Sequence, residues 1–216
     1  MLSLPKSTEF NKRIPKQKFY ENLSVTPVMK TAFTERIKSI YWRNKLATTT
    51  LNLAPSELVT ELEVFEIRLT SPELDENILR LIDREIPYHI LFLLEYDGKY
   101  QAVIGYKEAS GSGKAAFKVD CYYRTEWLTE EELSLHLEGL TIDAVYENFI
   151  RQIAGDRLIG GENTILKECV EQQKQREQIE KRIAVLEAKM KREKQLNRKM
   201  ELKEEIKKLN KALVNA

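Results

Sequence analysis

The sequence YHILFLLEYDGKYQAVIGYKEASGSGKAAFKVDCYYRTEW, residues 88–127, predicts three consecutive β-strands. Its apolar runs have the length and the aromatic and β-branched content of strands, and they span 89–96, 100–108 and 116–125. Asp97 and Gly98, between the first two runs, are a strong signal for a two-residue hairpin turn. We therefore expect an antiparallel meander at the centre of the fold.

The segments on either side of the meander predict one more strand and several helices. Residues 61–69 have strand character, and Ser71 followed by proline predicts the start of a helix that ends near Glu85. After the meander, we expect helices at 130–135 and 141–153. The predicted fold class is α/β (α+β), with a mainly antiparallel sheet of about four strands in the order β-α-β-β-β, packed with helices.

The N-terminal part predicts a lead-in followed by a helix. Residues 1–27 contain three prolines and seven large apolar side chains, which favours an extended segment packed on the domain, with one helical turn around 16–23. Residues 29–46 carry apolar side chains at helical spacing, with basic residues on the other faces. We expect an amphipathic helix there, ended by the threonines at 48–50.

The composition is that of a folded protein outside the membrane. The chain has 216 residues, of which 42% are hydrophobic, and this is enough for a core. No apolar run approaches the ~20 residues that span a bilayer, and the N-terminus does not resemble a secretory signal, so we expect a cytoplasmic protein. Two cysteines, Cys121 and Cys169, make neither a disulfide framework nor a zinc site.

The net charge of +1 conceals three segments of different charge. Residues 1–46 have a balance of +7, residues 47–160 of −11 and residues 161–216 of +5. Basic ends around an acidic middle favour either intramolecular pairing or the binding of nucleic acid by the ends. On the predicted helix at 29–46, the candidates for nucleic-acid binding are Lys38, Trp42, Arg43 and Lys45. The alternative is that aromatic residues of this helix only fill a core.

No catalytic or cofactor motif is complete. The GSGK sequence at 111–114 lacks the other residues of a phosphate-binding loop, and a Cys121–His89 pair is better interpreted as packing. We expect no cofactor and no metal site. A restriction-type nuclease would need Glu63, Glu95 and Lys107 around a divalent metal, but Gly105 stands where that motif has an acid. Four further polar or aromatic residues near predicted element ends are candidates for a site: Asp83, Lys107, Glu126 and Trp127.

The C-terminal arm, residues 161–216, predicts long helix. Residues 164–214 contain neither glycine nor proline and are rich in Glu, Lys, Arg, Gln and Leu. Two apolar seams at 4-3-4 spacing are the candidate partner-binding residues: Ile179, Ile183, Leu186 and Met190, then Leu202, Ile206, Leu209 and Leu213. The seams point in different directions on one straight helix. The arm is therefore either a hairpin that turns near 195–198, with Asn197 as a cap, or one coiled-coil helix with two docking faces. Its basic residues Lys194, Arg198 and Lys199 are further candidates for nucleic-acid binding.

Short motifs along the chain are similar to those of a bacterial domain-of-unknown-function family. They are Leu4-Pro5, Ser7-Thr8, Ile14-Pro15-Lys16, Trp42, Lys45-Leu46, Asn52-Leu53, the strand that begins at Glu61, Ile82-Asp83, Ile86-Pro87, Tyr106-Lys107, Tyr122-Tyr123, Thr125-Glu126-Trp127 and EKQLNRKMEL at 193–202. Members of that family are encoded beside helicase and DNA methyltransferase genes of restriction-type phage-defence systems. The resemblance implies this context and no catalytic residues.

These observations favour two domains, an α/β domain at 1–160 and the helical arm at 161–216. We expect a non-enzymatic accessory subunit of a bacterial DNA restriction or phage-defence assembly, which binds helicase and methyltransferase partners and DNA. The alternative function is the metal-dependent nuclease described above. Self-association through the arm is a third hypothesis.

Overall fold

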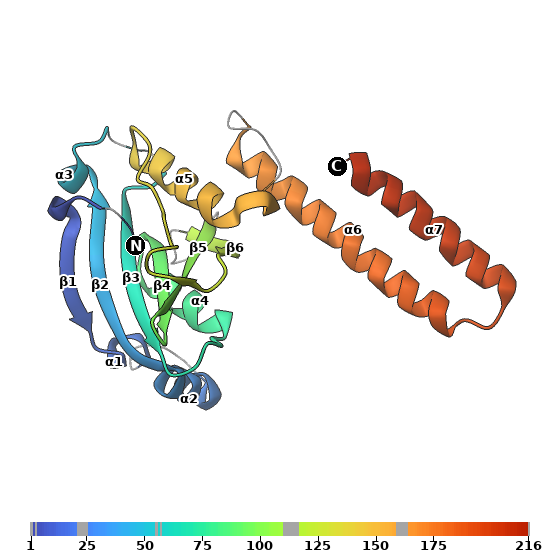
Figure 1. Ribbon diagram of the computed structural model, residues 1–216, viewed down its shortest axis with the longest axis horizontal. Helices are drawn as coiled ribbons and strands as arrows, with labels where there is room; N and C mark the ends of the chain where they lie inside the picture. Colours follow the sequence, from blue (N-terminus) through green and yellow to red (C-terminus); the bar gives the residue numbers. More distant parts are fainter. Residues whose placement is uncertain are drawn as a thin grey trace. The chain divides into compact units, whose positions relative to one another are not determined.

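The predicted meander is present in the computed structural model (Figure 1). Strand β4 (His89–Tyr96) turns through Asp97 and Gly98 into β5 (Lys99–Ala109), and both turn residues have positive φ, 49° and 74°. This is the geometry of a type I′ hairpin. Strand β6 (Phe117–Arg124) returns antiparallel to β5. The prediction of three strands is confirmed.

The structure describes residues 2, 4–20, 26–54, 56, 58–109, 117–158 and 164–215. The GSGK sequence at 111–114 lies outside these residues. Contacts divide the chain into two compact units, Met1–Ala154 and Gly155–Ala216.

The first unit contains a sheet larger than the four strands predicted. Its strands follow the order β1-β2-β3-β4-β5-β6, and β7 pairs with β5 beside β6. The predicted β-α-β-β-β segment corresponds to β3, α4, β4, β5 and β6. Only β3 and β4 are parallel, because helix α4 carries the chain back between them. The bounds of the other strands and of α4 are β1 Glu9–Ile14, β2 Ile37–Ala47, β3 Glu61–Leu69, β7 Leu128–Thr129 and α4 Glu76–Glu85.

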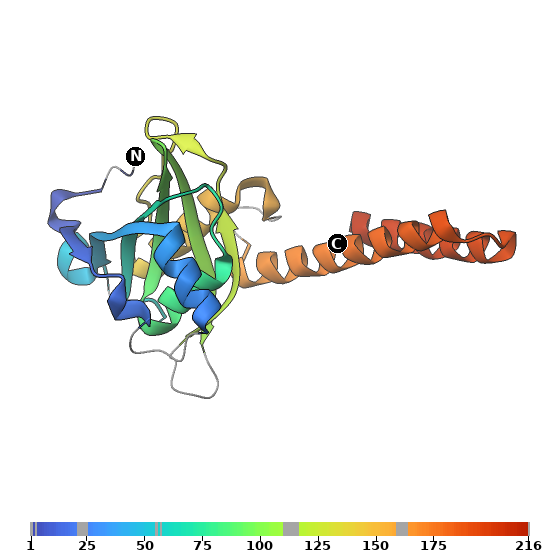
Figure 2. The same ribbon diagram turned by 90° about the horizontal axis from the view of Figure 1, so that it is seen from below.

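Helices cover both faces of this sheet. One core contains Phe33 of α2, Ile78 of α4 and Phe92 of β4, and α2 and α4 lie on the same side of the sheet (Figure 2). Helix α5 packs on the other face, where Tyr146 contacts His89. The remaining helices of this unit are α1 Gln17–Tyr20, α2 Pro27–Arg36, α3 Thr48–Leu51, α5 Ile142–Ala154 and a 3₁₀ turn at Lys6–Thr8.

The helix predicted at 29–46 is wrong in its second half. Thr26 caps α2 and Pro27 begins it, but the chain becomes strand β2 at Ile37. Residues 37–47 then pair with β3 on one side, and part of them with β1 on the other. Isoleucine and aromatic residues fit a strand with two neighbours better than an exposed helix. Spacing alone did not distinguish the two structures, because Phe33, Ile37 and Ile40 are buried in either case.

The structure differs from the sequence predictions at three further places. Asp75, and not Ser71, caps α4, since its Oδ1 accepts the Asn77 N–H at 2.9 Å. The segment at 130–135 forms a turn and irregular backbone instead of a helix. The threonines at 48–50 begin the short helix α3. The lead-in does pack on the domain as predicted: Phe19 of α1 is buried.

The arm is a helical hairpin. Helices α6 (Leu166–Arg192) and α7 (Leu196–Asn215) run antiparallel, and an Arg182–Glu205 ion pair at 3.0 Å joins them (Figure 1). All eight seam residues are buried or half-buried, and Leu186 is only 1% exposed. The hairpin alternative is therefore the observed one, and the two seams are partly covered within the chain.

The hairpin turn differs from the expected one in its cap. Asn197 lies inside α7 and is exposed. Glu193 closes the turn instead, because its Oε1 accepts the N–H groups of Lys194 and Gln195 at 2.8 and 2.9 Å. These bonds lower the pKa of Glu193. None of the described helices is both long enough and apolar enough to cross a lipid bilayer.

The hairpin predicts a contrast between two adjacent residues of α6. We expect Leu186→Ala to lower the free energy of unfolding by about 2–4 kcal/mol, because it leaves a cavity in the seam. Val185→Ala is the control: Val185 is 49% exposed, so its change should stay within about 0.5 kcal/mol. Chemical unfolding followed by far-ultraviolet circular dichroism measures both. Equal effects of the two variants would contradict the internal seam.

Candidate functional site

A buried ion pair joins helix α4 to strand β5, and strand β6 contributes a hydrogen bond to it. Lys107 of β5 places its Nζ 2.8 Å from Oδ1 of Asp83, which comes from α4. The Lys107 Nζ also donates to the Tyr88 carbonyl at 2.6 Å, and the Tyr122 hydroxyl of β6 donates to Asp83 Oδ2. Burial raises the pKa of Asp83, while the Lys107 ammonium and the Tyr122 hydroxyl oppose the rise. Burial and the nearby Asp83 raise the pKa of Tyr122.

The backbone around Lys107 is shaped to fit this pair. Register shifts between Tyr106 and Lys107, which marks a β-bulge. The Tyr146 hydroxyl of α5 donates to the Gly105 carbonyl at 2.7 Å and accepts the Lys107 N–H at 2.9 Å, so these two backbone groups of β5 are satisfied. A Cβ on Gly105 would lie 3.0 Å from Cε1 of Tyr122. The glycine that replaces the acid of the nuclease motif therefore makes room for the tyrosine ring.

This cluster holds the fold together more than it offers a site. The Lys107 and Asp83 side chains are 3% and 1% exposed, so a substrate in solvent does not reach them. Of the four residues singled out in the sequence, Asp83 and Lys107 meet here, Glu126 is exposed elsewhere and Trp127 packs against the core. Tyr122 and Tyr146 were missed, because no local pattern marks a tyrosine whose partner is about 40 residues away.

The structure does not assemble the nuclease residues. Glu63 lies opposite Ile90 on β4, whereas Glu95 lies opposite Arg68, five positions further along β3. At about 3.3 Å per residue, the two positions lie roughly 16 Å apart along the strands. Side chains alternate between the two faces of a sheet, so an odd number of positions places Glu63 and Glu95 on opposite faces. Lys107 is already paired with Asp83. Among the side chains that the structure describes, no three His, Cys, Asp or Glu residues are grouped so that they would hold a metal ion.

Glu63 is instead a buried carboxyl beside the half-buried Glu61. Its Oε2 accepts the Trp42 indole N–H at 2.6 Å, and Lys45 lies 2.8 Å from neighbouring Glu61. Burial raises the pKa of Glu63 to about 7, with the negative charge of Glu61 adding to the rise and Trp42 opposing it. The Glu63 side chain therefore changes charge near neutral pH.

Three of the four nucleic-acid candidates on β2 have partners inside the protein. Besides Trp42 and Lys45, Arg43 forms a 2.8 Å ion pair with the buried Glu66. Burial acts to raise the pKa of Glu66, but hydrogen bonds from Arg43 and Arg68 lower it below its usual value. Lys38 is the fourth candidate, and it is exposed. The structure thus places most of the predicted basic surface against carboxylates of the acidic segment.

His89 and Cys121 are not arranged as a base and a nucleophile. The His89 ring packs against Phe117 and Tyr146, with centroids 4.8 and 4.4 Å away. Burial and the Lys107 charge lower the pKa of His89 to about 3. Cys121 lies opposite Tyr106 in the β5–β6 ladder and is half-buried. The interpretation of His89 as a packing residue agrees with this geometry.

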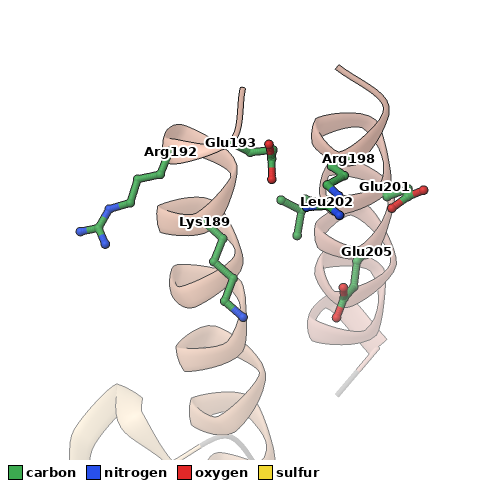
Figure 3. A pocket seen from close by; sticks show the side chains of 7 residues that line it. All are labelled: Lys189, Arg192, Glu193, Arg198, Glu201, Leu202 and Glu205. Carbon is green, nitrogen blue, oxygen red and sulfur yellow. The ribbon is translucent and has the colours of Figure 1, made fainter. Parts of the chain in front are cut away.

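A groove of about 460 Å³ lies between α6 and α7 next to the hairpin tip, residues 189–200. Figure 3 shows Leu202 pointing across the gap toward α6, whereas Arg192 points away from it. The described lining carries three cations and three carboxylates: Lys189, Arg192, Arg198, Glu193, Glu201 and Glu205. The other predicted contacts, Lys194 and Lys199, are exposed and half-buried respectively. The described lining of this groove therefore has no net charge, because its cations and carboxylates are equal in number.

The buried pair predicts a strong coupling between Asp83 and Lys107. We expect Asp83→Asn and Lys107→Met each to lower the free energy of unfolding by about 3–5 kcal/mol, because each leaves a buried polar partner uncompensated. The double variant should lose less than the sum of the two. Urea unfolding followed by tryptophan fluorescence measures the cycle. As a control, Arg84→Gln alters an exposed contact with Glu85 and should cost under about 1 kcal/mol. Additive effects of Asp83 and Lys107 would contradict the pairing.

Glu63 predicts a stability that depends on pH. The pKa of Glu63 in the folded protein is about 7, above the ordinary value of 4.5. Between pH 4.5 and pH 7, Glu63 therefore keeps its proton in the folded protein and has lost it in the unfolded chain. The free energy of unfolding should therefore fall by about 2–3 kcal/mol as pH rises from about 4.5 through about 7. Glu63→Gln should remove most of this fall in unfolding midpoints, and the exposed control Glu126→Gln should keep it. Parallel pH profiles for the wild type and Glu63→Gln would refute the assignment.

The comparisons with known proteins identify a family. No curated protein matches the chain, and no solved structure matches it. A family model described as "Domain of unknown function (DUF4391)" matches residues 2–213. This confirms the prediction that the chain belongs to a domain-of-unknown-function family. Because the match spans nearly the whole chain, the protein belongs to this DUF4391 family.

Proposed function

We propose that this protein is a non-enzymatic accessory subunit of a bacterial DNA restriction or phage-defence assembly. It binds a helicase or DNA methyltransferase subunit through the tip of its helical hairpin, and DNA through the cations there. The choice of partners comes from the resemblance noted in the sequence. The observation that carries the docking role is the exposed apolar pair Leu196 and Met200, which stands beside basic residues at the hairpin tip.

The hairpin supports a docking role because its own seams are partly covered within the chain. Leu186 and Ile206 are buried, so a second copy is not required to shield them. Leu196 and Met200 are 71% and 60% exposed and lie four positions apart, hence next to each other on α7. At 100° per residue they face away from the seam. Large apolar side chains that lie together on the exposed surface of a helix pair favour a contact with another protein.

The charges of the tip support an anionic component in that contact. Five of its cations are exposed, namely Lys189, Lys191, Arg192, Lys194 and Arg198, and Lys199 is half-buried. None of these six forms an ion pair within the described part of the chain. Exposed cations raise the rate of association with acidic surfaces and with DNA, and the effect weakens with salt.

The first unit supports an accessory role more than catalysis. Its buried charges are engaged with one another, as in the Asp83–Lys107 and Arg43–Glu66 pairs. Glu63, Glu95 and Lys107, which a restriction-type nuclease would need together, are separated by the strand register. The nuclease alternative has no comparable support.

Affinity purification of the tagged full chain from its native host tests the proposal. We expect a helicase or methyltransferase subunit to co-purify with the wild type, and its recovery to fall about tenfold with Leu196→Ser/Met200→Ser, since a hydrophobic anchor is lost. Both residues are exposed, so the variant should fold. The control Val28→Ser changes an apolar residue that is 79% exposed on α2 of the other unit. Recovery of neither enzyme with the wild type, or equal recovery with the tip variant, would overturn the proposal.

A further inference from the structure

We infer that a groove at the junction of β1 and β2 binds phosphate groups. Its volume is about 340 Å³, and it is lined by Arg13, Ile14, Pro15, Lys16, Gln17, Lys38 and Ser39. Three of these side chains are cations, two are neutral hydrogen-bonding groups, and none of the described lining residues is acidic. A concave surface with charge of one sign concentrates the field on an anion.

The strand pairing builds this groove from two separate segments. Strands β1 and β2 are antiparallel, with Arg13 opposite Tyr41 and Ile14 opposite Ile40. The chain leaves β1 at Pro15, next to the place where β2 begins. Residues 15–17 therefore lie beside Lys38 and Ser39, although more than 20 residues separate them in the sequence. The sequence prediction of a helix at 29–46 concealed this arrangement.

Lys16 gives the groove a fixed positive charge. Its Nζ donates to the Thr34 carbonyl at 3.0 Å and to the Ile37 carbonyl, at the C-terminal end of α2. Carbonyl groups at a helix end hold an ammonium in place without cancelling its charge. An ammonium has three donors, so one is left for a ligand. Lys16 therefore needs little reorganisation to contact an anion.

Arg13 and Lys38 differ from the neighbouring cations of β2. Arg43 and Lys45 are bound to Glu66 and Glu61, and the hairpin-tip groove has as many carboxylates as cations in its described lining. Arg13 and Lys38 are exposed, and no ion pair involves them among the described residues. The groove at β1 and β2 thus gathers positive charge that the described structure does not neutralise.

The lining also indicates what kind of ligand fits. A volume of about 340 Å³ is at the small end of ligand pockets. None of the described lining residues is aromatic, so this lining offers no platform on which a base would stack. Arginine and lysine contacts to phosphate position a backbone without reading its sequence. The ligand is therefore a phosphate group, from a nucleic-acid backbone or from inorganic polyphosphate.

Fluorescence anisotropy with the full chain tests the site. The probes are a labelled single-stranded DNA of mixed sequence and, as competitor, inorganic pyrophosphate. We expect Arg13→Gln/Lys38→Gln to weaken DNA binding about tenfold and to reduce its salt dependence, since two phosphate contacts are lost. Lys6→Gln/Lys12→Gln removes the same charge from the same basic segment outside the groove and should bind nearly as well as the wild type.

Each outcome decides the inference. Pyrophosphate competition that the groove variant abolishes would assign a free phosphate ligand, and DNA binding resistant to pyrophosphate but lost in the variant would assign the backbone. Absence of binding to both probes, or equal losses in the groove and control variants, would overturn the site. All variants change exposed side chains, and circular dichroism verifies their folding. The inference does not depend on the proposed assembly, because this experiment contains no partner and leaves the hairpin tip unchanged.

Discussion

A charge buried in a protein must be paired with an opposite charge. In the first unit, this requirement holds Asp83 of α4 against Lys107 of β5. It joins α4 to β5, and Tyr122 extends it to β6. Helix α4 must therefore lie across the strands that follow it, and this is also the position that lets β3 and β4 run parallel. Gly105 makes room in the sheet for the Tyr122 ring, and the Tyr146 hydroxyl of α5 bonds to the backbone of Gly105 and Lys107. One buried contact thus relates both layers of helices to the same strand.

The requirement that buried charges be paired also explains where the basic and acidic segments of the chain lie in the sheet. The basic N-terminal segment and the acidic middle segment are neighbours in the sheet, because β2 lies beside β3. Arg43 and Lys45 meet Glu66 and Glu61 across that boundary. Exposed cations outside this pairing include Arg13 and Lys38 near the end of β1 and the basic residues of the hairpin tip. Charge segregation in the sequence is therefore partly an internal feature of the sheet and only partly a surface for partners.

The two units differ in how they achieve stability. The sheet unit buries large aromatic and branched side chains on two faces and includes charged groups among them. The hairpin has a single narrow seam in which few residues are fully buried, so each seam residue contributes a large share. A helix pair with a narrow seam leaves most of its surface to solvent. That surface is mainly polar, so two large apolar residues exposed side by side on it indicate a contact site. For this reason the proposed protein contact is at Leu196 and Met200, with the proposed DNA contact at the cations beside them. The inferred phosphate groove is a separate feature of the sheet unit.

Local chemistry was sufficient to predict the β4–β5 hairpin, the β-α-β-β-β segment, helix α5 and the helical character of the arm. Turn residues, periodicity and the lack of glycine and proline act between residues close in the chain, so the sequence alone carries them. The strand β2, the cluster of Asp83 with Lys107 and Tyr122, and the pairing of Arg43 with Glu66 were decided by tertiary structure. Each depends on residues 20 to 40 positions apart, and burial next to a particular partner outweighs local preference. Asp83 and Lys107 were noticed separately in the sequence, but only the packing of α4 on the sheet made them a pair.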